Sequence, residues 1–234
     1  MSFVDLIPVV EKTSVKVAIR IRPLNDREYN SNPITEIINN TILLINPEDK
    51  KKKTFSYDYV FDQTTLQSEI YNKIGSQIID NAYKGYNCCI FAYGQTGSGK
   101  SHTMLGDTNV NAGLIPRICE NLFIQQDAHN NIDKGNCSIS YRTEISYLEI
   151  YSEEVQDLIN TNTQTSLKVR QHPEFGPYVE GLTQVLVEDY KSIKNIIEKG
   201  NKQRHTAFTL MNNKSSRSHA ILTIHAGQGG VEAM

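Results

Sequence analysis

Residues 94–101 read GQTGSGKS, and they end the most apolar run of the chain, Cys88–Tyr93. That run predicts a buried strand, and the residues from Ser101 onward predict a helix. A strand, a glycine loop and a helix in this order are typical of a phosphate-binding loop, because small residues let backbone N–H groups turn toward phosphate oxygens. Lys100 would add a full positive charge, and Ser101 a hydroxyl group for Mg²⁺. The loop therefore predicts nucleotide binding, with a glycine-rich turn that holds no ligand as the alternative.

The composition fits one large domain or two small ones and shows no bias toward nucleic acid. The chain has 234 residues and a net charge of −2, with acidic and basic residues interspersed. No apolar run reaches the length of a membrane span, and the first ten residues do not resemble a signal peptide. The four cysteines lack the spacing of metal ligands and predict buried, reduced thiols. We therefore expect a soluble, intracellular chain that binds neither nucleic acid nor membrane directly.

Strands and helices are mixed along the chain rather than segregated, which predicts an α/β layered fold. The expected strands cover about residues 15–21, 41–45, 54–60, 88–93, 138–151, 167–171, 178–187 and 220–226. The expected helices cover about residues 65–84, 101 onward, 116–126, 153–159 and 189–204. Thr64 and Gln67 predict a capping box at the start of the first helix, and Asp189 predicts a cap for the last one. No linker marks a domain boundary.

A second polar segment, NNKSSRSH at residues 212–219, could complete a catalytic site. Enzymes that hydrolyse nucleoside triphosphates need an element that senses the γ-phosphate and positions a water molecule. Hydroxyl groups and one fixed cation, Arg217, suit that purpose. A polar loop between a helix and a strand explains the same composition equally well.

Three motifs together resemble the signature of the kinesin motor domain. They are RIRPLN at 20–25, FAYGQTGSGKSHTM at 91–104 and NNKSSRSH at 212–219, in the order typical of that family, and SYLEIY at 146–151 is a further match. The resemblance runs from about residue 14 to the end of the chain. It implies a P-loop NTPase-type fold, a mixed central β-sheet with helices on both faces, with residues 1–13 as an N-terminal extension and 14–234 as a partial motor domain. Residues 172–182 are most similar to the third, cargo-transporting kinesin subfamily.

The resemblance also implies roles for individual residues and the ligands they would bind. The phosphates of ATP would be bound by Gly94, Gln95, Thr96, Gly97, Ser98, Gly99, Lys100 and Ser101. The adenine site would be lined by Arg20, Arg22, Pro23 and His102. The segment that senses the γ-phosphate would include Asn212, Ser215, Ser216 and Arg217, with Ser101 and Ser216 as ligands of Mg²⁺. The implied partner is the microtubule, contacted in part by residues 172–177, and the implied location is the cytoplasmic cytoskeleton.

One motif of the family, Asp-x-x-Gly-Ser-Glu of the switch II region, does not occur in the sequence. The main microtubule-binding helices and the neck linker, which follow it in the family, are not found either. In the family's sheet the two strands that flank residues 88–93 also belong to this missing part. We therefore expect two unpaired edges at residues 88–93 and a fragment of low stability.

Three functional hypotheses follow from these observations. The first is an ATP-dependent microtubule motor, a microtubule-stimulated ATPase when complete, of which this chain carries the nucleotide-binding half. The second is a kinesin-like module that holds nucleotide or tubulin without turnover. The third is another P-loop enzyme, such as a kinase or a GTPase, and it is disfavoured because the guanine-reading pattern Asn-Lys-x-Asp is absent from the sequence.

Overall fold

The structure is a computed structural model, and it describes residues 15–28, 30, 33–107, 110–132, 138–160, 166–174, 176–210 and 218–231. The chain divides into two compact units, Met1–Leu66 and Gln67–Met234. The sequence does not indicate this division, because no Gly-, Pro- or Ser-rich linker stands at Leu66. The limits of the N-terminal extension (1–13) and of the partial motor domain (14–234) stay predictions.

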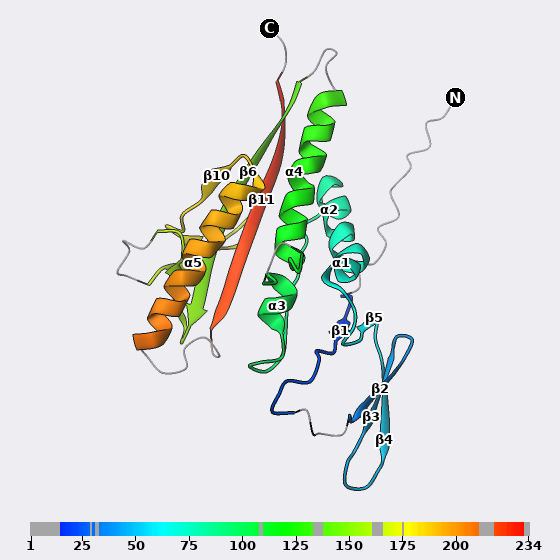
Figure 1. Cartoon of the computed structure of the whole chain (residues 1–234). Coiled ribbons are helices and arrows are strands. Elements are labelled where there is room, and N and C mark those ends of the chain that lie inside the picture. Colours follow the sequence, from blue (N-terminus) through cyan, green and yellow to red (C-terminus); the bar gives the residue numbers. More distant parts are fainter. Residues whose placement is uncertain are drawn as a thin grey trace, which may run out of the picture. The chain divides into compact units, whose positions relative to one another are not determined.

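The first unit is built of short strands. β1 (Ala18–Arg20) pairs in parallel with β5 (Tyr59–Phe61). β2 (Thr35–Ile38), β3 (Thr41–Ile45) and β4 (Lys52–Ser56) form an antiparallel sheet (Figure 1). The predicted hairpin is therefore confirmed as β3–β4, whereas the predicted strand 54–60 is divided between β4 and β5.

The first helix of the second unit contains a wider turn. α1 (Gln67–Ile70), a π-helical turn η1 (Tyr71–Gly75) and α2 (Ser76–Tyr83) follow one another directly. Ile70 and Ile79 are almost fully buried, as the apolar spacing predicts. The helix is confirmed, and the π-helical turn is a feature that the spacing does not indicate.

The predicted capping box at the start of this helix is wrong. The backbone N–H of Thr64 donates to the Asp62 carboxylate at 2.8 Å, so it is already satisfied within the first unit. The side-chain amide of Gln67 is used inside the second unit, where it donates to the carbonyl oxygen of His102.

The main sheet has the strand order β10-β6-β11, and β7 pairs with the end of β6. The strands are antiparallel and comprise β6 (Ser138–Tyr151), β7 (Glu154–Asp157), β10 (Val185–Val187) and β11 (His219–Val231). The predicted helical turns at 153–159 are wrong. Ser152 and Glu153 have φ angles of 50° and 64°, and two such residues make a tight hairpin that folds β7 back along β6.

A two-stranded ribbon, β8 (Lys168–His172) and β9 (Gly176–Glu180), is inserted between β7 and β10. The predicted strand 178–187 is thus divided between β9 and β10. Both ends of the insertion are tied to the buried carboxylate of Asp157. It accepts hydrogen bonds from the backbone N–H groups of Ile159 at 2.8 Å, Asn160 at 3.1 Å and Thr183 at 2.9 Å.

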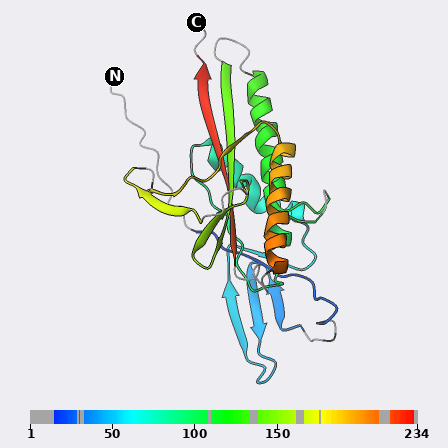
Figure 2. The same ribbon diagram turned by 90° about the vertical axis from the view of Figure 1, so that its left-hand side faces the viewer.

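α4 (Leu114–Ile132) and α5 (Tyr190–Leu210) lie on the same side of β6 and β11 (Figure 2). Asp189 caps α5 by accepting the N–H of Ser192 at 2.7 Å, as predicted.

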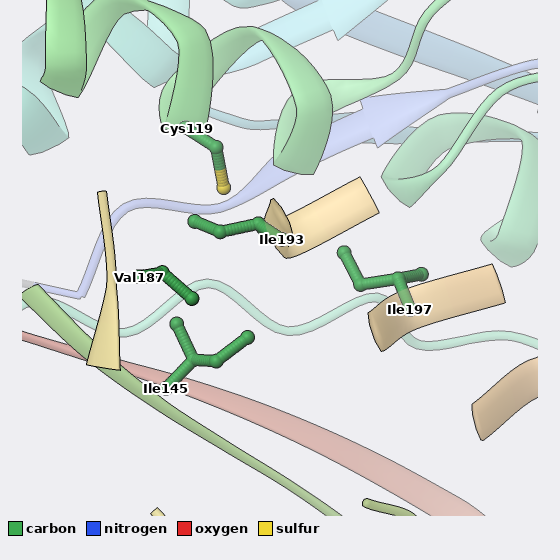
Figure 3. Close-up of a cluster of buried hydrophobic side chains, with 5 residues drawn as sticks. All are labelled: Cys119, Ile145, Val187, Ile193 and Ile197. Carbon is green, nitrogen blue, oxygen red and sulfur yellow. The ribbon is translucent and has the colours of Figure 1, made fainter. Parts of the chain in front are cut away.

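The core of the second unit lies between these helices and the sheet. Its buried members are Cys119, Ile145, Val187, Ile193 and Ile197 (Figure 3). Cys119 points from α4 toward Ile193 of α5, and Ile145 of β6 lies beside Val187. Burial raises the pKa of the Cys119 thiol to about 12.

Polar contacts continue this packing along β6. Gln126 of α4 donates to the hydroxyl of Thr143 at 3.1 Å, and both side chains are buried. The hydroxyl of Tyr147 donates to Asn201 of α5 at 2.9 Å. Residues two apart in a strand share one face, so residues 143, 145 and 147 all face the helices.

The predicted buried strand at Cys88–Tyr93 is not formed. These residues belong to no strand, and Phe91 and Tyr93 are 75% and 95% exposed. Cys88 and Cys89 are exposed as well, so the expectation of buried thiols fails for this pair. A strand needs a neighbour for its backbone hydrogen bonds, and no described strand pairs with this segment.

Candidate functional site

The glycine loop turns directly into α3 (Lys100–Met104), the helix predicted to begin near Ser101. Gly99 precedes the helix with φ 95°, a left-handed conformation that favours glycine. At Gly94 a side chain is excluded by space, because an added Cβ would lie 2.5 Å from the Ser98 hydroxyl oxygen. Gly94 and Gly99 are therefore the residues of the motif that the bend of the loop requires.

Lys100 folds back onto the loop that precedes it. Its Nζ atom donates to the carbonyl oxygen of Gly94 at 2.7 Å and to that of Gln95 at 2.9 Å. These bonds hold a positive charge against the loop, where a phosphate group would be bound. Ser101 is exposed in the first turn of α3, so its hydroxyl is accessible to a hydrated metal ion.

His102 is the next residue of α3, and its side chain is 46% exposed. Its Nε2 atom lies 3.9 Å from the Asp107 carboxylate. Its Nδ1 atom lies 3.3 Å from the amide nitrogen of Gln67. The sequence assigned Gln67 only to a helix cap, so this contact was missed. Nothing in the local pattern indicates it, because the two residues are 35 positions apart.

The residues proposed for the adenine site belong to the first unit, except for His102. Arg22 holds the Glu28 carboxylate with two bonds, from Nη1 at 2.7 Å and from Nη2 at 2.8 Å. Mainly because of these hydrogen bonds from Arg22, the pKa of Glu28 is lowered to about 2. Arg22 also donates to the carbonyl oxygen of Pro23 at 2.8 Å. Burial lowers the pKa of Arg20, the last residue of β1.

These contacts show Arg22 acting within its own loop. Asn25 contributes to the same turn, since its side-chain oxygen accepts the backbone N–H groups of Arg27 at 3.0 Å and Glu28 at 3.1 Å. The sequence indicated no role for Glu28, and it contained Asn25 only as the last residue of the RIRPLN motif. The role of Arg20, Arg22 and Pro23 toward a nucleotide stays a prediction.

The residues expected to sense the γ-phosphate lie outside the described part of the chain; these are Asn212, Ser215, Ser216 and Arg217. The nearest described residues are Leu210, at the end of α5, and Ser218. Arg204 of α5 donates to the Glu149 carboxylate of β6 at 3.0 Å and to the hydroxyl of Ser218 at 3.4 Å. The Glu149 side chain is only 5% exposed, and this ion pair fixes α5 to the sheet beside Ser218.

Within the described residues, no three or more His, Cys, Asp or Glu side chains are grouped to hold a metal ion. The expected Mg²⁺ ligands are hydroxyl groups, so this finding does not bear on them. Among the described residues, no helix is both long enough and apolar enough to cross a membrane.

Comparison with known proteins gives the family. The chain matches the family model of the kinesin motor domain over residues 20–232. It is 46% identical over 224 residues to kinesin-like protein KIF1B of Rattus norvegicus and 44% identical over 224 residues to kinesin-like protein unc-104 of Caenorhabditis elegans. These alignments include 90% and 91% of this chain, but the chain spans only 12% and 14% of the length of those two proteins.

A solved structure agrees with this result. It contains residues 391–772 of KIF14, a dimer in the two-heads-bound state with AMP-PNP, in complex with a microtubule. The TM-score is 0.80 at 39% sequence identity, and the match covers 92% of this chain and 61% of that chain. The likeness confirms the α/β fold expected from the sequence, and the chain belongs to the kinesin motor domain family.

Proposed function

We propose that the protein containing this chain is an ATP-driven microtubule motor and that this chain carries its nucleotide-binding half. The observation that carries the proposal is the loop at residues 94–101, with Lys100 held against it by the carbonyl oxygens of Gly94 and Gln95. The KIF14 structure that the chain resembles contains AMP-PNP and a microtubule, which supports the same nucleotide and the same partner here.

The loop residues would bind the phosphates mainly through backbone N–H groups. Lys100 would exchange its two carbonyl contacts for oxygens of the β- and γ-phosphates, because a phosphate oxygen is the stronger, charged acceptor. Ser101 and Ser216 would hold Mg²⁺, which neutralises charge on the phosphates. Arg20, Arg22, Pro23 and His102 would form the adenine site.

Asn212, Ser215 and Ser216 would orient the attacking water and sense the γ-phosphate, and Arg217 would stabilise the closed arrangement. Phosphoryl transfer depends on positioning and charge rather than on a covalent intermediate with the protein, so short polar side chains suffice. The Arg204–Glu149 ion pair would anchor the end of α5, and with it the segment 212–217, to the sheet.

Residues 172–177 are the part of this chain that we assign to tubulin, and they belong to the β8–β9 ribbon. Its Arg170 is paired with Glu180 at 2.9 Å, both side chains being about half exposed. A paired charge attracts an acidic surface less than a free one, so we expect a small electrostatic contribution from the ribbon. A microtubule partner implies a location on the cytoplasmic cytoskeleton, and the similarity to KIF1B and unc-104 supports the third, cargo-transporting subfamily.

Lys100→Ala tests the proposal in the full-length protein. Removing a charged donor to phosphate should weaken Mg·ATP binding about 10- to 100-fold, measured by calorimetry. Microtubule-stimulated phosphate release should fall to background. Lys84→Ala, at an exposed lysine after α2, is the matched control and should bind Mg·ATP as the wild type does.

Unchanged Mg·ATP affinity in Lys100→Ala would count against the phosphate-binding role of the loop. Normal binding without microtubule-stimulated release in the wild-type protein would favour the module without turnover.

A further inference from the structure

The side chain of Gln67 connects three parts of the second unit. Gln67 is the first residue of α1 and is only 6% exposed. Its amide nitrogen donates to the carbonyl oxygen of His102 in α3 and, at 3.4 Å, to that of Asn111. The same nitrogen lies 3.3 Å from His102 Nδ1. A buried amide with these contacts restricts the orientation of the histidine ring.

The contacts determine the orientation of the Gln67 amide. Backbone carbonyl oxygens accept hydrogen bonds and cannot donate them, so the NH₂ group must face His102 O and Asn111 O. An N–H on His102 Nδ1 would then point at another N–H group. An unprotonated Nδ1 can accept a share of one of these two N–H groups in a three-centre bond, so we expect the ring proton of the neutral histidine on Nε2.

The far edge of the ring faces a different environment. Nε2 lies 3.9 Å from the Asp107 carboxylate, which favours a proton on that nitrogen. The loop that carries Asp107 is closed by a bridge between Gly106 and Ala112, and Arg117 donates to the carbonyl oxygen of Ala112 at 2.9 Å. One edge of the ring is thus held by a buried amide, while the side chain remains 46% exposed.

We propose that Gln67 is a positioning residue for nucleobase binding, which fixes the ring orientation and the Nε2–H tautomer of His102. The inference rests on the proposed function, in which His102 stacks near the adenine base. A ring that is already fixed loses little rotational freedom when a base stacks on it, so more of the stacking energy appears as affinity. Gln67 would act only through His102, and the phosphate-binding loop would not depend on it.

The test compares two ligands in the full chain, Mg·ATP and magnesium tripolyphosphate, which has the phosphates but no base. Gln67→Met keeps the length of the side chain and removes the amide. It should weaken Mg·ATP binding about three- to tenfold, because base stacking on an aromatic ring contributes up to about a hundredfold in all. Tripolyphosphate binding should stay within about twofold of the wild type. Gln77→Met, which removes an exposed amide bonded to the Lys73 carbonyl oxygen, is the matched control.

A spectroscopic measurement tests the contact itself, without nucleotide. In the ¹⁵N-histidine spectrum at about pH 8, where an ordinary imidazole is neutral, His102 should carry its proton on Nε2. The signals are assigned with His102→Gln. Gln67→Glu replaces the donor by an acceptor and should move the proton to Nδ1. A wild-type ring with its proton on Nδ1 would overturn the inference.

The binding results separate the remaining outcomes. Equal losses of both ligands in Gln67→Met would show a purely structural role and overturn the inference. A wild-type chain that binds ATP no better than tripolyphosphate would overturn it too, while the phosphate-binding function stands. If the wild type binds neither ligand, the proposed function fails and the inference fails with it.

Discussion

β6 and the segment Cys88–Tyr93 are both rich in apolar and aromatic residues, and both belong to the second unit. β6 is paired along one edge with β11 and along the other with β7 and β10, and its residues 145–149 are buried. The segment Cys88–Tyr93 pairs with no described strand, and most of its side chains are exposed. Apolar sequence alone therefore does not make a strand. The difference between the two regions is the presence of partners for the backbone.

The largest loss of stability is expected when the buried ion pair of β6 is broken. Arg204→Ala leaves the Glu149 carboxylate, 5% exposed, without its cation, and should lower the free energy of unfolding by about 3–5 kcal/mol. Urea unfolding followed by circular dichroism measures the change. Arg170→Ala breaks a half-exposed pair with Glu180 and should cost about 1 kcal/mol or less. Equal losses in the two variants would contradict the burial of Glu149.

A second pair of variants compares apolar side chains directly. Ile145→Ala removes a fully buried side chain from the core and should cost about 2–5 kcal/mol. Phe91→Ala, at a side chain that is 75% exposed, should change the stability by about 0.5 kcal/mol or less. The same unfolding measurement applies. A loss of several kcal/mol in Phe91→Ala would mean that Cys88–Tyr93 is packed in solution.

The mildest probe is thiol labelling, which leaves the stability of the chain unchanged until a thiol reacts. Cys88 and Cys89 are exposed and should react with iodoacetamide at about pH 8 in the native chain, Cys88 more slowly because partial burial raises its pKa. Cys119 is fully buried, and burial raises its pKa to about 12, so it should react only after unfolding. Peptide mass mapping reports each site separately. If Cys88 and Cys89 did not react with iodoacetamide in the native chain, the segment Cys88–Tyr93 would be buried like β6, and the contrast between the two regions would be wrong.

Much of the fold follows from local patterns in the sequence. The strand at Ser138–Tyr151, the hairpin β3–β4 and the Asp189 cap of α5 were all predicted, because alternation, turn residues and a capping side chain are local signals. The wrong predictions concern segments whose structure depends on contacts distant in sequence or on an unusual backbone conformation. Residues 154–157 form a strand because Ser152 and Glu153 both adopt positive φ, which neither residue type favours.

The candidate site divides in the same way. The loop at 94–101 and its helix could be read from the sequence, since glycine spacing reflects the backbone directly. Gln67 could not, because its partners His102 and Asn111 are 35 and 44 residues away. Glu28 was missed for another reason. A carboxylate six positions after Arg22 is a common surface pattern, and only its two short bonds distinguish it.

The carboxylate of Asp157 has a consequence for the segment between β7 and β10. It accepts hydrogen bonds from the backbone N–H groups of residues 159, 160 and 183. The start and the end of the connection between β7 and β10 are therefore held together by one side chain. Lengthening a connection whose ends are already fixed costs little entropy. A longer or shorter β8–β9 ribbon should therefore be tolerated in this chain, while β10 keeps its register on β6. The surface of the ribbon can thus change in sequence while the pairing of β10 with β6 stays the same.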